Sequence, residues 1–521
     1  MKVLVADLIA SQGVEELRRF AEVDLRTGMT PEELLRVIPG YEALVVRSET
    51  QVTAEVIAAG TKLRVVGRAG VGVDNIDVAA ATRRGVLVVN APTGNTIAAT
   101  EHTFAMLLAL ARNIPDAHHS LKSGRWERSR FIGAELHGRT LAVVGLGKIG
   151  WEVARRARAF EMEIVAYDPF VTAEQARAAG IELLPLSEVM RRADFLTVHA
   201  PLTPATTNLI GAAELALAKP TLRLVNCARG GIIDEQALAS AVAEQRVAGA
   251  AVDVFTHEPA VDNPLVKASG KLVVTPHLGG STEEAQIAVA IDVARQLEEV
   301  QQGRQPRYAV NAPALLPEEL EALRPFLALA EKLGRLYSQM QEPLGDIEVM
   351  AGGAVARYPI APITAYVLKG ILEATSEERV NLVNAQTVAT ARGLNVAEKK
   401  VFEIPNYESL VTLRVGETVV AGTVEYGEAR IVRVNGYRVS VPAAGIWLVA
   451  QHRDQPGMVG RVGTELGDAD VNISGMEVGR LTARGEESVM ILILDDPIPA
   501  AVLAHIRAIP GIVRALVVQL D

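Results

Sequence analysis

A chain of 521 residues, 49% of them hydrophobic, is long enough for about three or four domains that each bury a core. The formal net charge of −10 argues against a general nucleic-acid-binding surface, and a single cysteine excludes an internal disulfide framework and a cysteine-cluster metal site. No apolar run approaches the ~20 residues that cross a bilayer, and the opening segment MKVLVADLIA reaches Asp7 too early for a signal peptide. We therefore expect a cytoplasmic, multidomain globular protein that binds neither nucleic acid nor membrane.

The first 90 residues predict a small α/β unit. The apolar runs VLVAD, ALVVR, LRVVGR and VLVVN are each followed by a helical or turn segment. Arg47 and Arg68 come at the carboxyl ends of two of these predicted strands. Each alone is no better than a surface arginine, but together they indicate an anion site.

A long amphipathic helix is predicted over residues 93–122, beginning at a threonine or asparagine cap. It would join the first unit to a second one. The segment GRWERSRF (124–131) that follows carries three arginines around aromatic side chains, which leaves open a phosphate site or an exposed loop.

Between residues 139 and 277, short apolar runs alternate with longer helical patterns. The runs are TLAVVG, EIVAYD, FLTVHA, LRLVNCA, AAVDVF and LVVTPH. This alternation is typical of βαβ units in a parallel, doubly wound (Rossmann) sheet.

The strongest local motif is VVGLGKIG, in which Gly145, Gly147 and Gly150 fit G-x-G-x-x-G between a strand and a helix. Such glycines let the backbone turn tightly and approach a pyrophosphate at the helix N-terminus. Asp168, which ends the next strand, is placed to bind the adenosine ribose and to repel a 2′-phosphate. The pattern predicts NAD as cofactor in preference to NADP.

Three polar residues follow the last three predicted strands of this unit: Arg229, Glu258 and His277. Ligands of open α/β sheets bind outside the carboxyl ends of the strands, so we expect these side chains to share one crevice. A histidine can accept the proton of an alcohol, a carboxylate beside it favours the charged ring, and an arginine provides a planar fork for a carboxylate. The set predicts hydride exchange between a 2-hydroxy acid and a 2-oxo acid, without a metal.

Two features of the run LRLVNCARGGIID need separate interpretations. Cys227 has no partner histidine in its own loop, so we interpret its thiol as a packing group. Gly230 and Gly231 would let the backbone turn sharply where the chain leaves the strand.

The remainder of the chain predicts a helix and two further modules. Residues 281–304 are helical with an acidic first turn, and QPRYAVNAPALLP (305–317) is a domain boundary. Residues 317–443 mix helices and strands as an α+β module, and residues 446–521 follow βαββαβ order, typical of a ferredoxin-like ligand-binding or dimerisation module.

The segments GRAGVGVDNID (67–77), VVGLGKIG, YDP, NCARGGIIDE, DVFTHEP and TPHLGGST together resemble the D-isomer-specific 2-hydroxyacid dehydrogenases, in the long form that carries an intervening domain and an ACT domain. The resemblance implies a discontinuous, flavodoxin-like substrate domain (1–92 plus 282–312) and an inserted NAD-binding Rossmann domain (93–281). It also implies an intervening, allosteric substrate-binding domain (317–443) and a regulatory ACT domain (446–521).

The same resemblance implies an activity. It is the NAD-dependent oxidation of 3-phospho-D-glycerate to 3-phosphohydroxypyruvate, the first step of the phosphorylated L-serine pathway, in a homodimer or homotetramer. L-serine is the effector implied for the ACT domain. Two alternatives stay open: another D-2-hydroxy acid dehydrogenase, acting on glycerate, lactate or 2-hydroxyglutarate, and a catalytically silent regulator that binds NAD and an amino acid.

Residue roles carry over from the family by position. The implied catalytic residues are Arg229, which holds the substrate carboxylate, Glu258, and His277, the acid/base. The implied substrate residues are Arg47, Arg68, Gly70, and Arg128 or Arg130, the last pair reaching across a dimer. The implied effector residues are Asp454, Gly457, Asn472 and Ile473. The implied NAD contacts, beside the three glycines, are Val71, Lys148, Ile149, Asp168, Ala200, Cys227, Ala228, Arg229, Asp253, His277, Leu278, Gly279 and Gly280.

Overall fold

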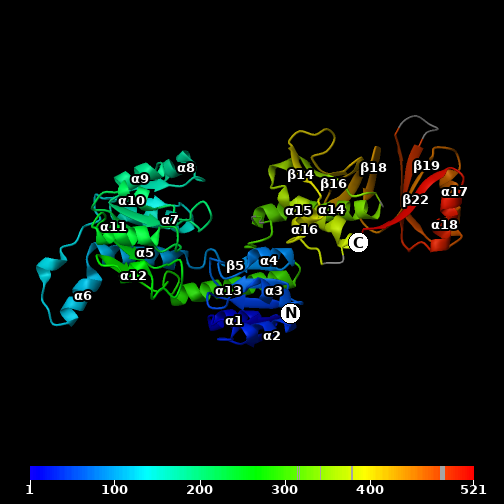
Figure 1. Cartoon of the computed structure of the whole chain (residues 1–521). Helices are drawn as coiled ribbons and strands as arrows, with labels where there is room; N and C mark the ends of the chain where they lie inside the picture. The colour runs from blue at the N-terminus through cyan, green and yellow to red at the C-terminus, as the bar shows by residue number, and fades with distance from the viewer. Residues whose placement is uncertain (314, 316, 341, 377–378, 482–486, 521) are drawn as a thin grey trace.

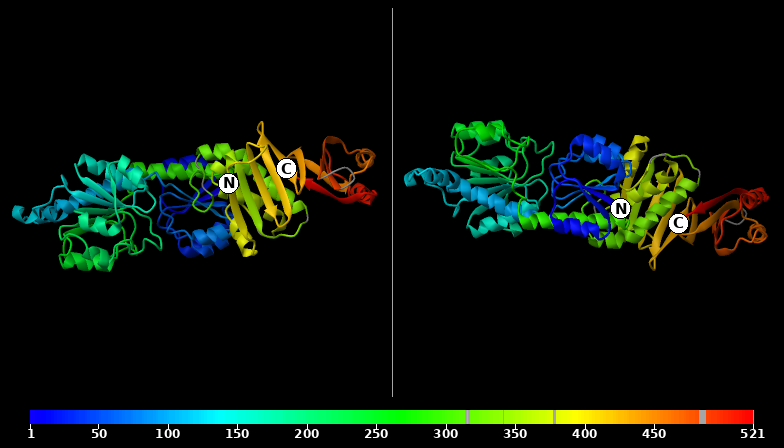
Figure 2. Two further views of the ribbon diagram at one scale, coloured as in Figure 1. Left: turned by 90° about the horizontal axis from the view of Figure 1, so that it is seen from above. Right: turned by 90° about the horizontal axis from the view of Figure 1, so that it is seen from below.

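The computed structural model describes residues 1–313, 315, 317–340, 342–376, 379–481 and 487–520, which leaves residues 482–486 and 521 of the predicted last module outside the described residues. The chain forms four units, each around its own sheet (Figures 1 and 2). The first unit contains β1–β5 and α13, and the second runs from α5 to β12. The third runs from α14 to β18, and the fourth from β19 to β22. The second and fourth units lie at the two ends of the molecule (Figure 1).

The first unit is a five-stranded parallel sheet in the order β2-β1-β3-β4-β5. This is the flavodoxin-like order that the resemblance implied. The four predicted strands are confirmed, and a fifth, β2, lies at the edge, where no residue is fully buried. The elements are β1 (Lys2–Val5), α1 (Ser11–Arg18), β2 (Glu22–Leu25), α2 (Pro31–Val37), β3 (Ala43–Val46), α3 (Ala54–Ala59), β4 (Val65–Arg68), α4 (Val78–Arg83) and β5 (Leu87–Asn90).

Helix α13 (Glu283–Gln301) returns from the second unit and packs on the first. Its buried side chains Val289, Val293 and Leu297 share a core with β1, β3 and β4. It also crosses α1 closely enough that a side chain at Gly13 would overlap Ala290. Figure 2 shows this long helix beside α1, extending from one unit into the other.

The second unit is a seven-stranded parallel sheet in the order β12-β11-β10-β9-β6-β7-β8. The six predicted strands are confirmed, and the order reverses between β6 and β9, which is the switch point of a doubly wound fold. Its strands are β6 (Thr140–Val144), β7 (Glu163–Tyr167), β8 (Glu182–Leu183), β9 (Phe195–Val198), β10 (Arg223–Asn226), β11 (Gly249–Val252) and β12 (Leu272–Val274). Its helices between the strands are α7 (Lys148–Ala159), α8 (Ala173–Ala178), α9 (Leu186–Arg192), α10 (Ala212–Ala216), α11 (Glu235–Ala243) and α12 (Pro264–Lys267).

The single helix predicted over 93–122 is wrong, because the chain breaks it in two. Helix α5 (Thr96–Ala111) is mostly buried, and α6 (Ile114–Lys122) follows Asn113, which adopts a left-handed conformation with φ 55°. Pro115 in the first turn of α6 lacks the N–H that a continuous helix would need. Together with the short helix η2 (Arg128–Phe131), α6 forms an arm that projects from the second unit (Figure 1).

The third unit is a mixed six-stranded sheet in the order β14-β13-β15-β16-β17-β18, with β13 and β14 parallel and the remaining neighbours antiparallel. The α+β prediction holds, but β13, β14 and α15 were not predicted. The elements are α14 (Pro317–Gln339), β13 (Ile347–Gly353), α15 (Ala361–Leu372), α16 (Ala385–Ala391), β14 (Val396–Val401), β15 (Ser409–Val415), β16 (Thr418–Glu425), β17 (Glu428–Val434) and β18 (Tyr437–Pro442).

The fourth unit has the predicted βαββαβ order, with an antiparallel sheet ordered β20-β21-β19-β22. One face is covered by its helices, and side chains of the other face, including Trp447 and Val518, join the core of the third unit. The third and fourth units are therefore packed together through a shared apolar core. The elements are β19 (Ile446–Arg453), α17 (Met458–Gly467), β20 (Ile473–Arg480), β21 (Glu487–Leu494), α18 (Ala500–Ala508) and β22 (Ile512–Gln519).

Candidate active site

A cavity of about 280 Å³ lies between the first and second units, at the carboxyl ends of strands from both. The first unit contributes the loops after β3 and β4, the second contributes those after β10, β11 and β12, and the start of α13 closes one side. Eight of the residues predicted for the site line this cavity: Arg47, Arg68, Gly70, Val71, Arg229, Glu258, His277 and Gly280.

Arg229, Glu258 and His277 meet because β10, β11 and β12 are adjacent parallel strands. The Nδ1 atom of His277 is 2.8 Å from Oε2 of Glu258. The other Glu258 oxygen accepts a hydrogen bond from the backbone N–H of Phe255 at 3.0 Å. This leaves Nε2 of the ring free of the carboxylate, so that it can exchange a proton with a group in the cavity.

Glu258 is half-buried, and burial by itself raises its pKa. The hydrogen bonds from His277 and from the Phe255 amide outweigh that effect, so the pKa of Glu258 lies below its ordinary value. The carboxylate is therefore ionised near neutral pH and can stabilise a protonated imidazole.

Arg229 is held by two contacts that leave one end of its guanidinium available. Its Nε donates to Oδ2 of Asp74 in the first unit at 3.1 Å, and Nη1 donates to the carbonyl of Ala228 at 2.7 Å. Nη2 makes no hydrogen bond with any residue that the structure describes. The chain turns beneath it at Gly230, where a side chain would overlap the backbone of Phe255, and at Gly231, whose φ is 79°.

Arg68 and Arg47 approach the cavity from the first unit. Nε of Arg68 donates to Oδ1 of Asn75 at 3.2 Å, while its terminal nitrogens have no hydrogen-bond partner within the described chain. Burial, with a further effect from the charge of Arg229, lowers the pKa of Arg68 to about 10. A partly desolvated cluster of arginines of this kind is stabilised by a bound anion.

Asp253 is completely buried beneath the loop that carries His277. Its Oδ1 accepts hydrogen bonds from Thr275 Oγ1 at 2.6 Å and from the N–H of Leu278 at 2.7 Å, and its Oδ2 accepts one from the N–H of Gly279 at 2.9 Å. His102 lies 3.2 Å away on α5. Burial raises the pKa of Asp253, but these bonds together lower it overall. The carboxylate holds the loop in place.

The glycine turn after β6 has the geometry that a dinucleotide requires. Gly145 has φ 95°, and a side chain at Gly150 would overlap the carbonyl of Gly145, so helix α7 can pack tightly against the turn. Open space lies above Gly147, which precedes Lys148 at the start of α7. Asp168 follows β7 and accepts a hydrogen bond from the N–H of Leu146 at 2.7 Å, which fixes the carboxylate beside the turn. These residues fit NAD.

The other predicted cofactor residues lie around this turn or beyond β10. Ala200 follows β9 against Gly145, and the carbonyl of Cys227 lies near Gly279. The Cys227 thiol is buried, and burial raises its pKa. The remaining predicted contacts are Ile149 on α7, Ala228 in the loop after β10, and Leu278 in the His277 loop.

Arg128 and Arg130 do not approach the cavity of their own chain. Both belong to the arm, on η2, where Arg130 lies 3.4 Å from Glu127. Of the effector residues, Asp454 follows β19 and its carboxylate pairs with Arg480 at the end of β20, at 3.0 Å. Asn472 and Ile473 lie at the beginning of β20, where Asn472 bonds Asp495 at 2.6 Å, and Gly457 caps α17. Asp454 and Asn472 are therefore at opposite ends of one strand.

Four residues that hold the predicted side chains of the site in place were not themselves predicted. Asp7 accepts the N–H of Arg47 at 2.6 Å and orders its loop, and Asn75 and Asp74 hold Arg68 and Arg229. His102 touches Asp253. Asp7 ends a predicted strand, and Asp74 and Asn75 lie in the segment GRAGVGVDNID, which were usable signals, whereas nothing in the sequence around His102 connects it with Asp253.

Three parts of the chain match family models. Residues 104–279 match the D-isomer specific 2-hydroxyacid dehydrogenase, NAD binding domain. Residues 322–435 match the D-3-phosphoglycerate dehydrogenase intervening domain, and residues 446–511 match the ACT domain. Among the described residues, no helix combines the length and apolar character needed to cross a membrane.

Relatives match along the full length. The D-3-phosphoglycerate dehydrogenases of Synechocystis sp. and Archaeoglobus fulgidus are 47% and 44% identical over 100% of this chain, and over 95% and 100% of their own lengths. A solved protein from Thermus thermophilus has a TM-score of 0.55 at 33% identity and covers 60% of this chain and 100% of its own. NAD-dependent formate dehydrogenase from Staphylococcus aureus, in complex with NAD, has a TM-score of 0.54 at 29% identity, covering 58% of this chain and 96% of its own.

Proposed function

The chain belongs to the D-3-phosphoglycerate dehydrogenases, within the D-isomer-specific 2-hydroxyacid dehydrogenase family, and from this premise we propose which residues carry its reaction. The reaction is the NAD-dependent oxidation of 3-phospho-D-glycerate to 3-phosphohydroxypyruvate, the first step of phosphorylated L-serine biosynthesis. The observation that carries the proposal is that the His277–Glu258 pair and three arginines from two units line one cavity.

His277 is the acid/base. Nε2 takes the proton of the C2 hydroxyl as the C2–O bond becomes a carbonyl, and Glu258 stabilises the imidazolium that forms. NAD, when bound, supplies the acceptor for the C2 hydride. In the reverse direction, His277 returns the proton to the carbonyl oxygen.

Arg229 binds the substrate carboxylate. Its free Nη2 is the donor, while Asp74 and the Ala228 carbonyl hold the other nitrogens and so fix the plane of the guanidinium. A carboxylate fixed next to C2 sets which face of that carbon points toward the cofactor side of the cavity.

Arg68 and Arg47 bind the 3-phosphate. Both belong to the first unit, whereas Arg229 and His277 belong to the second, and all four line the same cavity, so a substrate with charged groups at both ends spans the two units. Gly70 and Val71 also line the cavity, and Gly70 lies against the guanidinium of Arg68, where a side chain would clash.

The cofactor residues divide into two groups. The glycine turn, Lys148, Ile149 and Asp168 hold the adenosine and pyrophosphate portion. Ala200, Cys227, Ala228 and the His277–Gly280 loop surround the nicotinamide portion, with Asp253 acting from beneath as a positioning residue. The substrate domain is residues 1–92 with 282–312, and the NAD-binding domain is residues 93–281. The intervening domain is residues 317–443, and the ACT domain is residues 446–521.

We also propose that the protein is a homo-oligomer that works in the cytoplasm. Trp126 and Ile132 on the arm are 82% and 83% exposed, which is unusual for large apolar side chains and favours a partner surface on a second copy. An arm that reaches a second copy would bring Arg128 or Arg130 toward that copy's cavity. The buried, unpaired Cys227 suits a reducing compartment.

L-serine is the proposed effector of the ACT domain. Asp454 and Asn472 are separated by the eight residues of β20, about 25 Å, too far for one small amino acid to touch both within one chain. Two copies paired antiparallel along β20 would bring Asp454 of one next to Asn472 of the other. This geometry supports a serine site between two ACT domains.

The testing experiment is a steady-state NADH assay with phosphohydroxypyruvate, repeated with millimolar L-serine and with glycerate, lactate and 2-hydroxyglutarate as alternative substrates. Arg68→Gln should raise the KM for 3-phosphoglycerate at least tenfold while leaving the KM for NAD unchanged. His277→Ala should abolish turnover but retain NADH binding. Equal effects on both KM values, or near-normal turnover of the His277 variant, would overturn these assignments.

A further inference from the structure

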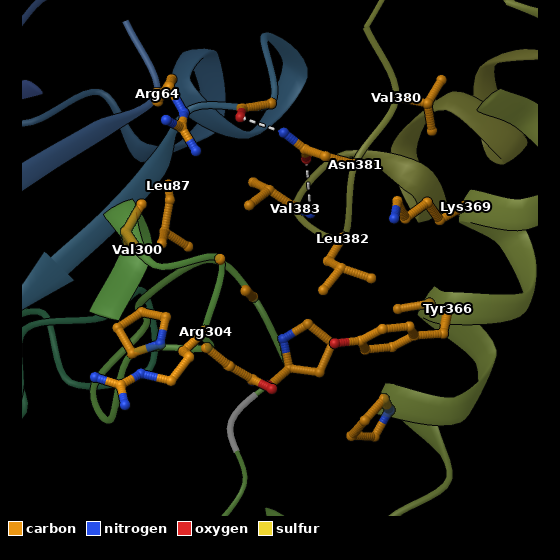
Figure 3. A pocket seen from close by; sticks show the side chains of 18 of the residues that line it. Arg64, Leu87, Val300, Arg304, Tyr366, Lys369, Val380, Asn381, Leu382 and Val383 are labelled. Carbon is orange, nitrogen blue, oxygen red and sulfur yellow. Dashed lines mark hydrogen bonds between the residues drawn. The ribbon is translucent and has the colours of Figure 1, made fainter. Parts of the chain in front are cut away.

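A second cavity, of about 410 Å³, lies at the junction of the first and third units, away from the active site (Figure 3). One wall is formed by the amino ends of β4 and β5 and the end of α13. The opposite wall is formed by α15 and the loop that follows it, residues 379–383. Two further cavities, of about 180 and 550 Å³, adjoin the same junction, so the two units meet without close packing.

The lining of this junction cavity is strongly cationic in a chain whose net charge is −10. It contains four basic side chains, Arg64, Arg304, Lys369 and Arg379, against one acid, Glu373. Unpaired positive charges facing one another across a cavity repel, and a bound anion relieves that repulsion.

Two of these four cations are already paired, and two are not. Lys369 lies 2.8 Å from Glu331, and Arg64 lies 3.9 Å from Glu42. Arg304 and Arg379 form no ion pair with any residue that the structure describes. They come from different walls, Arg304 from the first unit and Arg379 from the third.

Between the cations, the lining is apolar and contains one unused hydroxyl. Figure 3 shows Leu382 and Val383 between Arg64 and Arg304 on one side and Lys369 and Tyr366 on the other, with Leu87 on the side of the two arginines. The Tyr366 hydroxyl, although half-buried, makes no hydrogen bond within the described chain. A short carbon skeleton would contact the apolar part while its ends meet the charges.

The first and third units are joined more weakly than the third and fourth units are. Asn381 Nδ2 donates to the carbonyl of Gly85 at 2.7 Å, and no ion pair joins described residues of the first and third units. The third and fourth units, by contrast, share an apolar core. A ligand in the junction cavity would therefore contribute a large part of the contact between its two walls.

We propose that the junction cavity is a binding site for a small organic dianion, with two carboxylate or phosphate-type groups on a short uncharged skeleton. One anionic group pairs with Arg304 and the other with Arg379, and the Tyr366 hydroxyl donates to the ligand. This site is separate from the active site and does not depend on the reaction proposed for it.

The position of the site gives it a structural connection to catalysis. Arg64 directly precedes β4, whose last residue is Arg68, so the two cavities lie at opposite ends of the same strand, about 13 Å apart along it. Val300 at the end of α13 lines the junction cavity, while Gln286 and Val289 near its beginning line the active site. The junction ligand thus contacts elements that also form the substrate site.

The test is calorimetric titration of the full-length protein with two probes, glutarate and 3-phosphonopropionate, which distinguish a dicarboxylate from a phosphate-type ligand. The double variant Arg304→Gln/Arg379→Gln should weaken binding of the preferred probe about tenfold or more, or remove one class of site. A matched double variant on the second unit, Arg155→Gln/Arg177→Gln, removes the same charge and should bind as the parent chain does.

Tyr366→Phe removes only the unused hydroxyl, so it should fold normally and weaken probe binding about threefold to tenfold. Steady-state kcat and KM without probe should be the same in all these variants, because none of the changed residues lines the active site. The proposal is overturned if neither probe binds at 10 mM, or if the Arg304/Arg379 variant and Tyr366→Phe bind both probes as the parent chain does.

Discussion

Replacing Asp253 with asparagine tests whether the buried carboxylate positions the loop that carries His277. Asparagine keeps one oxygen, which can still accept from Thr275 and Leu278. Its NH₂ group, however, faces the N–H of Gly279, which loses its 2.9 Å acceptor. The change therefore leaves a donor against a donor in a completely buried position.

The magnitude follows from these contacts. A buried N–H without a partner costs about 1–3 kcal/mol, and the two remaining hydrogen bonds lose their charge assistance, roughly 0.5–1 kcal/mol each. His277 has a left-handed backbone with φ 55°, which itself costs about 1–2 kcal/mol and relaxes when the loop is released. Together these effects favour displacement of the His277 loop by about 3 kcal/mol. Because about 1.4 kcal/mol corresponds to a tenfold change in rate, kcat should fall roughly one hundredfold.

The assay is steady-state oxidation of 3-phosphoglycerate, with NADH binding followed by fluorescence to show that the variant retains its cofactor site. Asp262→Asn, the same substitution at an exposed carboxylate outside the active site, is the control and should leave kcat unchanged. If Asp253→Asn keeps kcat within threefold of the parent chain, the positioning role is refuted.

Three further predictions concern the same unit. Glu258→Gln should lower kcat for 3-phosphoglycerate oxidation at neutral pH roughly one hundredfold, because it removes the ionised carboxylate that stabilises the imidazolium formed on His277. A kcat within threefold of that of the parent chain would contradict the pairing. Gly150→Ala should weaken NADH binding more than tenfold by fluorescence titration, because the methyl group overlaps the Gly145 carbonyl; unchanged affinity would disprove the tight turn. Burial raises the pKa of the Cys227 thiol, so iodoacetamide at pH 8 should alkylate it in unfolded chain at least a hundredfold faster than in native chain, and equal rates would contradict its burial.

Where the prediction of elements failed, the local pattern was missing. Strand β2 (EVDL) has no buried residue, so it lacks the apolar alternation of a strand. Helix α15 is buried on nearly every side and therefore shows no amphipathic period. The helix over 93–122 was predicted as continuous because its composition is helical throughout, while a single left-handed residue, Asn113, divides it.

The candidate site was predictable where topology alone brings residues together. Arg229, Glu258 and His277 follow three strands of a parallel sheet, and neighbouring parallel strands must end at the same edge. The contact of Asp74 with Arg229 was not predictable in this way, because the two residues lie 155 positions apart and belong to different units. His102 and Asp253 belong to the same unit, but His102 lies on a helix and not at a strand end, so the strand order alone does not bring them together.

The sequence by itself determined the periodicities, the glycine turn and the polar residues at strand ends, because these depend on neighbours a few residues apart. From them came the two α/β units, the cofactor motif and the catalytic set. Only the tertiary structure decided how the units meet: that Arg68 and His277 line one cavity, that the buried Asp253 holds the His277 loop, and that Arg304 and Arg379 line another cavity. Such contacts depend on how separately folded surfaces pack, and no local pattern of residues encodes that packing.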